Sequence, residues 1–69
     1  MAEALIWLNG EKINYPVELL LPELLMQLGY RPQVVVVELN GELLPRAQWS
    51  QQIIRPYDNL EVVTIVGGG

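Results

Sequence analysis

The chain has 69 residues, of which 51% are hydrophobic, and eight acidic against four basic residues give a formal net charge of −4. It contains no Cys and no His, which excludes a disulfide framework, a thiol nucleophile, a zinc–thiolate site and the imidazole base common near neutral pH. The negative charge and the scattered basic residues argue against a phosphate-binding surface, so we expect no nucleic-acid partner. The composition indicates one small folded domain that does not catalyse a reaction with its own side chains.

Targeting signals are equally sparse. No apolar run approaches the ~20 residues of a membrane span. Glu3 near the start, without a basic segment, argues against a signal peptide. We therefore expect a cytoplasmic protein with no membrane contact and no bound metal.

Residues 4–15 are expected to form a β-hairpin. Asn9-Gly10 is the preferred pair for a two-residue type I′ turn, because both positions require positive φ. This turn fixes the register and therefore which side chains face the core. It pairs Trp7 with Lys12 and Ile6 with Ile13, buries Ile6, Leu8 and Ile13, and leaves Leu5 and Trp7 on the wetter face.

An amphipathic helix is expected over residues 21–28. Four leucines recur at i, i+3, i+4 and i+7 and form one stripe that would face a sheet. Pro22 suits the first turn and Gly29 the position after the last turn. Leu20 stands where a Ser, Thr or Asp cap is usual, and the sequence does not explain it. The leucines are Leu21, Leu24, Leu25 and Leu28.

Residues 33–39 contain a β-branched run that predicts a central strand. Asn40-Gly41 repeats the turn signal and returns the chain through residues 42–44, an edge segment that Pro45 breaks. The side chains expected to point inward from the central strand are Val35, Val37 and Leu39.

The last third of the chain predicts a loop followed by a strand. Residues 47–54 show no clear period and are expected to hold a turn of helix packed by Trp49 or Ile53, with Arg46 in a surface ion pair. Residues 55–59 form a loop in which Asp58 can bond its own backbone. Residues 60–66 form the last strand, where Glu61 marks the exposed parity. Val63 and Ile65 share that parity.

The order is strand, strand, helix, strand, short edge strand, strand. One helix against a mixed sheet of four or five strands is an α+β architecture, and this order is that of the β-grasp fold, as in ubiquitin. We expect a β-grasp domain over residues 1–66 and a flexible glycine tail over residues 67–69.

The tail, Gly67-Gly68-Gly69, follows directly on the last strand. Residues without side chains permit close backbone approach and many conformations. We expect Gly69 to present its main-chain carboxylate to an enzyme through a narrow opening. The alternative is a frayed or engineered end without a function.

Residues 36–49 resemble the ThiS family, the bacterial sulfur carriers of the thiamine pathway. The shared elements are a strand that ends in Asn40, the Pro45-Arg46 step and Trp49 shortly after it. Residues 58–64 with the terminal Gly-Gly resemble the closing strand and diglycine of that family, so the resemblance covers nearly the whole chain. One departure is Tyr57, where the family usually has Gly, because a Gly there suggests a positive φ that strains a Tyr.

The resemblance implies a protein co-substrate and not an enzyme. A ubiquitin-activating-type enzyme would use ATP to adenylate the carboxylate of Gly69, next to Gly68, and a persulfide sulfur donor would displace AMP to leave a thiocarboxylate. Thiazole synthase would then take the sulfur into the thiazole of thiamine. The carrier would bind no cofactor, because the partner consumes the ATP. Partner contacts are expected at Gly67 and at an apolar patch of Trp7, Leu5, Val63 and Ile65.

Three other functions fit parts of the sequence. The sulfur carrier of molybdopterin synthase shares fold and diglycine, but it tends to be longer and has a proline before the diglycine that residues 64–67 lack. A ubiquitin-like modifier would become joined to lysine side chains. A β-grasp binding module would keep its function without Gly68-Gly69.

Overall fold

The computed structural model describes residues 3–16 and 19–65, which form one mixed sheet with one α-helix and two short 3₁₀ helices. The strand order is β2-β1-β5-β3-β4, with β1 parallel to β5 and the other neighbours antiparallel. This is the α+β arrangement expected from the sequence. The elements are β1 (Glu3–Leu8), β2 (Glu11–Pro16), α1 (Leu21–Gln27), η1 (Pro32–Val34), β3 (Val35–Leu39), β4 (Glu42–Leu43), η2 (Arg46–Gln51) and β5 (Asn59–Thr64).

Both predicted Asn-Gly turns are confirmed. Asn9 and Gly10 have φ of 50° and 86°, and Asn40 and Gly41 have φ of 53° and 87°, the positive values that a type I′ turn requires. The first hairpin has the predicted register, with Trp7↔Lys12 and Ile6↔Ile13. The turn therefore fixes the register of the hairpin and with it which side chains of β1 and β2 share a face.

The helix begins without a side-chain cap because another segment supplies the missing partner. The N–H of Leu21 donates to the Gln52 carbonyl at 2.9 Å, and Leu20 forms an antiparallel bridge with Ile53. Pro22 has no N–H that needs a partner. Gly29 follows the helix with φ of 89°, as expected of a residue at that position.

The predicted strand over residues 33–39 begins two residues later than expected. Pro32 opens the 3₁₀ turn η1, and β3 starts at Val35. β3 is an interior strand, while β5 takes the central position. The last strand is likewise shorter than residues 60–66, because β5 ends at Thr64. Val66 lies outside the described residues.

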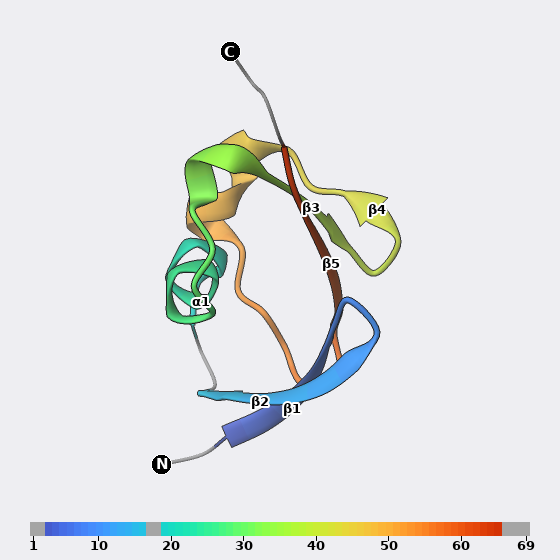
Figure 1. The fold of residues 1–69 in the computed structure, drawn as a ribbon. Coiled ribbons are helices and arrows are strands. Elements are labelled where there is room, and N and C mark those ends of the chain that lie inside the picture. The colour runs from blue at the N-terminus through green and yellow to red at the C-terminus, as the bar shows by residue number, and fades with distance from the viewer. Residues whose placement is uncertain (1–2, 17–18, 66–69) are drawn as a thin grey trace.

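The core lies between the sheet and α1, which covers one side of the sheet (Figure 1). Trp49 is only 4% exposed while Ile53 is 48% exposed, so Trp49 is the residue that packs η2. Leu8 and Ile13 are half-buried at the margin of the core, which is less than the burial expected for them. The buried residues are Ile6, Tyr15, Leu21, Leu24, Leu25, Val35, Val37, Trp49, Ile54, Leu60 and Val62.

Candidate functional site around the end of β5

The strand that leads to the glycine tail is held on its β3 side up to its last described residue. Thr64 pairs with Val35, and the N–H of Ile65 donates to the Val34 carbonyl at 2.6 Å. The predicted site residues Gly67, Gly68 and Gly69 lie outside the described residues. Among the described residues, the site consists of the end of β5 and the side chains around it.

Exposed aliphatic side chains lie near the end of β5, on the side of the sheet opposite the buried residues. Val62 is buried, whereas Val63 and Ile65 are 57% and 48% exposed, which confirms the parity that Glu61 indicated. Val63 pairs directly with Val36 on β3, which is also exposed. The exposed side of β3, β4 and β5, hereafter the outer face, is thus apolar near the exit of the chain.

Leu5 and Trp7 share the parity of this face but lie far from its apolar end. Trp7 pairs with Asn59, which precedes Val63 by four residues, or about 13 Å at ~3.3 Å per residue. Leu5 lies two residues further back along β1. Trp7 is half-buried, with the Lys12 ammonium 5.4 Å from its ring centroid. The four predicted residues therefore do not form one continuous patch, because the parallel pairing of β1 with β5 offsets them.

Two carboxylates separate the two regions. Glu38 and Glu61 are directly opposite each other on β3 and β5, and both are exposed. Leu43 on β4 pairs with Glu38 from the other side and is 67% exposed. Like charges directly opposite in a sheet are unfavourable, so this pair lowers the stability of the fold slightly.

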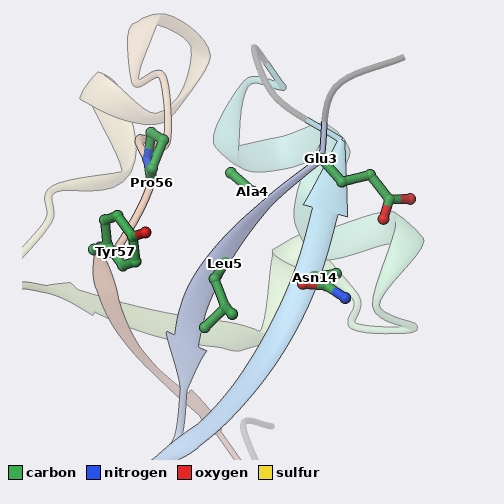
Figure 2. Close-up of a pocket in the computed structure, with 6 residues that line it drawn as sticks. All are labelled: Glu3, Ala4, Leu5, Asn14, Pro56 and Tyr57. Carbon is green, nitrogen blue, oxygen red and sulfur yellow. The ribbon is translucent and has the colours of Figure 1, made fainter.

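Leu5 belongs instead to a depression at the start of β1. This cavity of about 440 Å³ is shown in Figure 2, where Leu5 lies between Asn14 and Tyr57. Tyr57 has φ of 68°, and its N–H donates to the Leu5 carbonyl at 2.6 Å. The loop therefore keeps the left-handed conformation that a glycine would adopt without strain. The lining residues are Glu3, Ala4, Leu5, Asn14, Pro56 and Tyr57.

Arg46 and Trp49 fasten η2 to the sheet. The Arg46 guanidinium donates to the carbonyls of Pro32 and Val35, the latter at 3.0 Å, and lies 4.5 Å from the Trp49 ring centroid. Trp49 donates its indole N–H to the Leu44 carbonyl at 3.0 Å. A surface ion pair was expected for Arg46; among the described residues its guanidinium instead bonds one backbone carbonyl of η1 and one of β3.

Residues 3–16 and 19–65 contain no group of three His, Cys, Asp or Glu side chains placed to hold a metal ion. Within the same ranges, no helix is long and apolar enough to cross a bilayer. The candidate functional features are therefore the outer face, the strand that leads into the glycines and the depression at the start of β1.

Comparison with known proteins identifies the family, because residues 6–69 match the ThiS family, terminal glycines included. The chain belongs to the ThiS family. A solved structure of the thiamine biosynthesis protein ThiS from Geobacter metallireducens superposes with a TM-score of 0.80 at 31% identity, over 94% of this chain and 99% of that one. The β-grasp fold predicted from the element order is thereby confirmed.

Other relatives differ in how much of their length this ThiS chain covers. The sulfur carrier protein ThiS of Escherichia coli (strain K12) is 34% identical over 47 residues, which is 68% of this chain and 71% of that protein. A thiazole synthase of Paramagnetospirillum magneticum is 36% identical over 90% of this chain. The chain spans only 19% of the length of that synthase. The similarity is therefore to one segment of a much larger protein.

Proposed function

We propose that this ThiS chain is a sulfur carrier whose Gly69 carboxylate is adenylated and converted to a thiocarboxylate, which then donates sulfur to thiazole formation in thiamine biosynthesis. The observation that carries the proposal is the family match over residues 6–69, which includes the terminal glycines. The carrier would act in the cytoplasm, and it would need no bound cofactor of its own because the partner enzyme consumes the ATP.

The chemistry explains why the carboxylate of Gly69 is the reactive group. A carboxylate is a poor electrophile until one oxygen becomes part of a good leaving group, as in an acyl adenylate. A sulfur nucleophile then attacks the acyl carbon and AMP leaves. Sulfide gives the thiocarboxylate directly, whereas a persulfide gives an acyl disulfide whose S–S bond a thiol must then reduce to release the thiocarboxylate. Because the chain contains no Cys, it has no thiol on which to carry sulfur as a persulfide. Gly67 and Gly68 would let the tail enter the enclosed site of the adenylating enzyme.

Thiazole synthase is the proposed recipient of the sulfur. Thiazole synthases of Paramagnetospirillum magneticum and Magnetococcus marinus each contain a segment similar to this chain, over 90% and 93% of the chain at 36% and 39% identity respectively. The presence of a carrier-like segment within thiazole synthases supports a functional link between the two proteins.

The outer face is the proposed contact surface for these partners. Val63 and Ile65 lie just before the tail and are exposed, so a partner that encloses the glycines would cover them first. Trp7 and Leu5 lie further back along the face and would be reached only by a partner that extends past Glu61.

The test is an intact mass spectrum of the protein before and after reaction with ATP, sulfide and an adenylating enzyme of thiamine biosynthesis. The starting mass checks that Gly69 carries a free carboxylate. We expect a mass gain that matches exchange of one oxygen for one sulfur, and we expect deletion of Gly69 to abolish it. No gain with an enzyme that activates its own carrier would contradict the proposal.

Transfer to a purified thiazole synthase separates this pathway from molybdopterin synthesis. Loss of the added sulfur mass on incubation with the synthase and its small-molecule substrates supports the thiamine pathway. A ubiquitin-like modifier would instead appear in cell extracts as a ladder of covalent conjugates on a denaturing gel.

A further inference from the structure

We propose that Asn40 is the site at which this chain is modified by deamidation, and that the new carboxylate at position 40 loosens the hairpin of β3 and β4. Deamidation is the loss of a side-chain amide as ammonia, and it converts an asparagine to an aspartate or an isoaspartate. The modification needs only water, so it is independent of the sulfur chemistry proposed for the tail.

The chemistry favours an asparagine that precedes a glycine. The backbone nitrogen of the next residue loses its proton and attacks the side-chain Cγ. The new N–C bond closes a succinimide ring, and the side-chain nitrogen leaves as ammonia with that proton. Water then opens the ring at either carbonyl, so the chain has exchanged one –NH₂ group for one –OH group. Glycine has no side chain to obstruct the attacking nitrogen, and beyond the chain neighbours no atom lies within 4 Å of where a Cβ would be at Gly10 or Gly41.

The chain contains two such sites with the same local sequence. Leu-Asn-Gly-Glu occurs at residues 8–11 and again at residues 39–42. The other asparagines precede Tyr15 and Leu60, whose bulky side chains hinder the attack. Because the two Asn-Gly sites have identical neighbours, any difference between their rates in the folded chain comes from the fold.

The amide of Asn9 is held by three hydrogen bonds. Its Oδ1 accepts the N–H of Val62 at 2.8 Å, and its Nδ2 donates to the Val62 carbonyl at 3.2 Å and to the Tyr30 hydroxyl at 3.3 Å. Both bonds to Val62 are partly buried, and this hairpin joins two strands of six residues each. To react, the amide must leave all three partners, so the folded state shields it.

The amide of Asn40 is held more weakly. Its Oδ1 accepts the N–H of Asn59 at 2.9 Å and its Nδ2 donates to Asp58 at 3.1 Å, and both bonds are exposed. The hairpin that carries Asn40 ends in β4, a strand of only two residues. Short pairing with exposed hydrogen bonds opens at a low cost in free energy. Asn40 should therefore react first.

Modification of Asn40 replaces an attraction with a repulsion. The nitrogen that donates to Asp58 becomes an oxygen, so two carboxylates face each other where donor and acceptor lie 3.1 Å apart. Asp58 is fixed from other sides, because its Oδ2 accepts the Arg55 N–H at 2.8 Å and its carbonyl accepts the Trp7 N–H at 2.9 Å. The residue at position 40 must move instead, and the bond to the Asn59 N–H is lost with it. An isoaspartate also adds one atom to the backbone, which distorts the turn.

The first experiment follows deamidation of the full chain at mildly alkaline pH, folded and in urea, with peptide mapping to count the modified molecules at each Asn-Gly site. In urea the two sites should react at equal rates, because their neighbours are the same. In the folded chain Asn40 should react on the order of tenfold faster than Asn9, because fewer hydrogen bonds must break.

The second experiment measures the consequence with a variant that mimics the product. Asn40→Asp should lower the equilibrium constant of folding on the order of tenfold, and most of this loss should disappear in an Asp58→Asn background, where an amide can donate to the new carboxylate. Asp58→Asn alone is the matched control, since it keeps an acceptor for the Arg55 N–H. Amide hydrogen exchange should become faster at Leu44, whose N–H donates to the Val37 carbonyl at 2.9 Å across the hairpin.

Equal rates at the two sites in the folded chain, a faster rate at Asn9, or unequal rates in urea would overturn the assignment of Asn40. Equal losses from Asn40→Asp in both backgrounds would overturn the role of Asp58. Unchanged exchange at Leu44 would show that the hairpin does not loosen.

Discussion

At the residue scale, the asparagines of the two turns do more than adopt positive φ. The Asn9 side chain accepts the N–H of Val62 at 2.8 Å and donates to the carbonyl of the same residue at 3.2 Å. Asn40 acts similarly, because its Oδ1 accepts the N–H of Asn59 at 2.9 Å. The side-chain amide of each turn thus hydrogen-bonds the backbone of β5, as a neighbouring strand would. β5 is the strand that leads to the tail.

Replacing Asn9 with Gly separates these two roles. Gly adopts the turn conformation freely, so the hairpin should form, but Val62 loses both of its side-chain hydrogen bonds. We expect the free energy of unfolding to fall by about 1–3 kcal/mol, measured by urea denaturation. The stability of Asn9→Asp should lie between those of the wild type and Asn9→Gly, because the Asp side chain accepts the Val62 N–H and cannot donate to the Val62 carbonyl. A wild-type midpoint for Asn9→Gly would show that the clamp contributes nothing.

The buried hydroxyl of Tyr15 makes the stability of the fold depend on pH in the alkaline range. Its hydroxyl donates to the Ile54 carbonyl at 2.6 Å inside the core, and burial, followed by the negative charge of Asp58, raises the pKa of this hydroxyl above its usual value of about 10. The unfolded chain therefore releases this proton at a lower pH than the folded chain does. The contribution of Tyr15 to stability is complete below about pH 10 and declines as pH rises above it.

The check is a series of urea titrations between neutral pH and the alkaline range, with wild type and Tyr15→Phe. The variant should be less stable at neutral pH by about 1–3 kcal/mol, because the buried Ile54 carbonyl loses its donor. The difference between the two proteins should shrink as pH rises past 10. A constant difference would mean that another group causes the alkaline loss.

At the element scale, η2 shows how a sequence signature can be structural. The Pro45-Arg46 step with Trp49 carried the resemblance to the family, and in the fold these side chains tie η2 to the unpaired end of β3. An edge with unpaired backbone groups invites association with another strand, and the Arg46 guanidinium occupies the Val35 carbonyl there. The signature therefore protects the open edge of β3.

Arg46→Lys tests this role while keeping the charge. Lys lacks the planar fork that bonds two carbonyls and the flat surface that stacks on Trp49. We expect a loss of about 1–2 kcal/mol in the free energy of unfolding, together with faster amide hydrogen exchange at β3. Arg55→Lys, an exposed Arg on the following loop, is the matched control. Equal effects of the two substitutions would contradict a special role for Arg46.

Local signals predicted more of the elements than of the contacts between them. The Asn-Gly pairs and the leucine stripe were sufficient for both turns and the helix, because those features depend on neighbours in sequence. The partner of the Leu21 N–H is Gln52, and the acceptors of Arg46 lie 11 and 14 residues upstream. The offset of Trp7 from Val63 depends on parallel pairing between the first and last strands, which no local pattern reveals.

At the scale of the whole molecule, the two sides of the sheet have different tasks. One side carries the core and α1, and its buried residues end at Val62 along the chain. The other side leaves an apolar strip and an acidic pair exposed next to the end of β5. Stability and the proposed function therefore depend on different residues. A change in the tail should abolish the gain of sulfur and leave the stability of the fold unchanged.

Two changes at the tail test this separation. Deletion of residues 67–69 should leave the urea midpoint within error of the wild type, because the described core and the Ile65 to Val34 hydrogen bond lie before the deletion. Adding one Ala after Gly69 should likewise preserve stability. Both variants should fail to gain sulfur mass with ATP, sulfide and the adenylating enzyme, since the carboxylate is removed or displaced from the reacting position, where small misplacements cost large factors in rate. Yet both should still bind the enzyme through the outer face.

Loss of stability in either variant would show that the tail contributes to the fold. A gain of sulfur mass by the variant with the added Ala would show that the enzyme does not require the carboxylate at the position of Gly69.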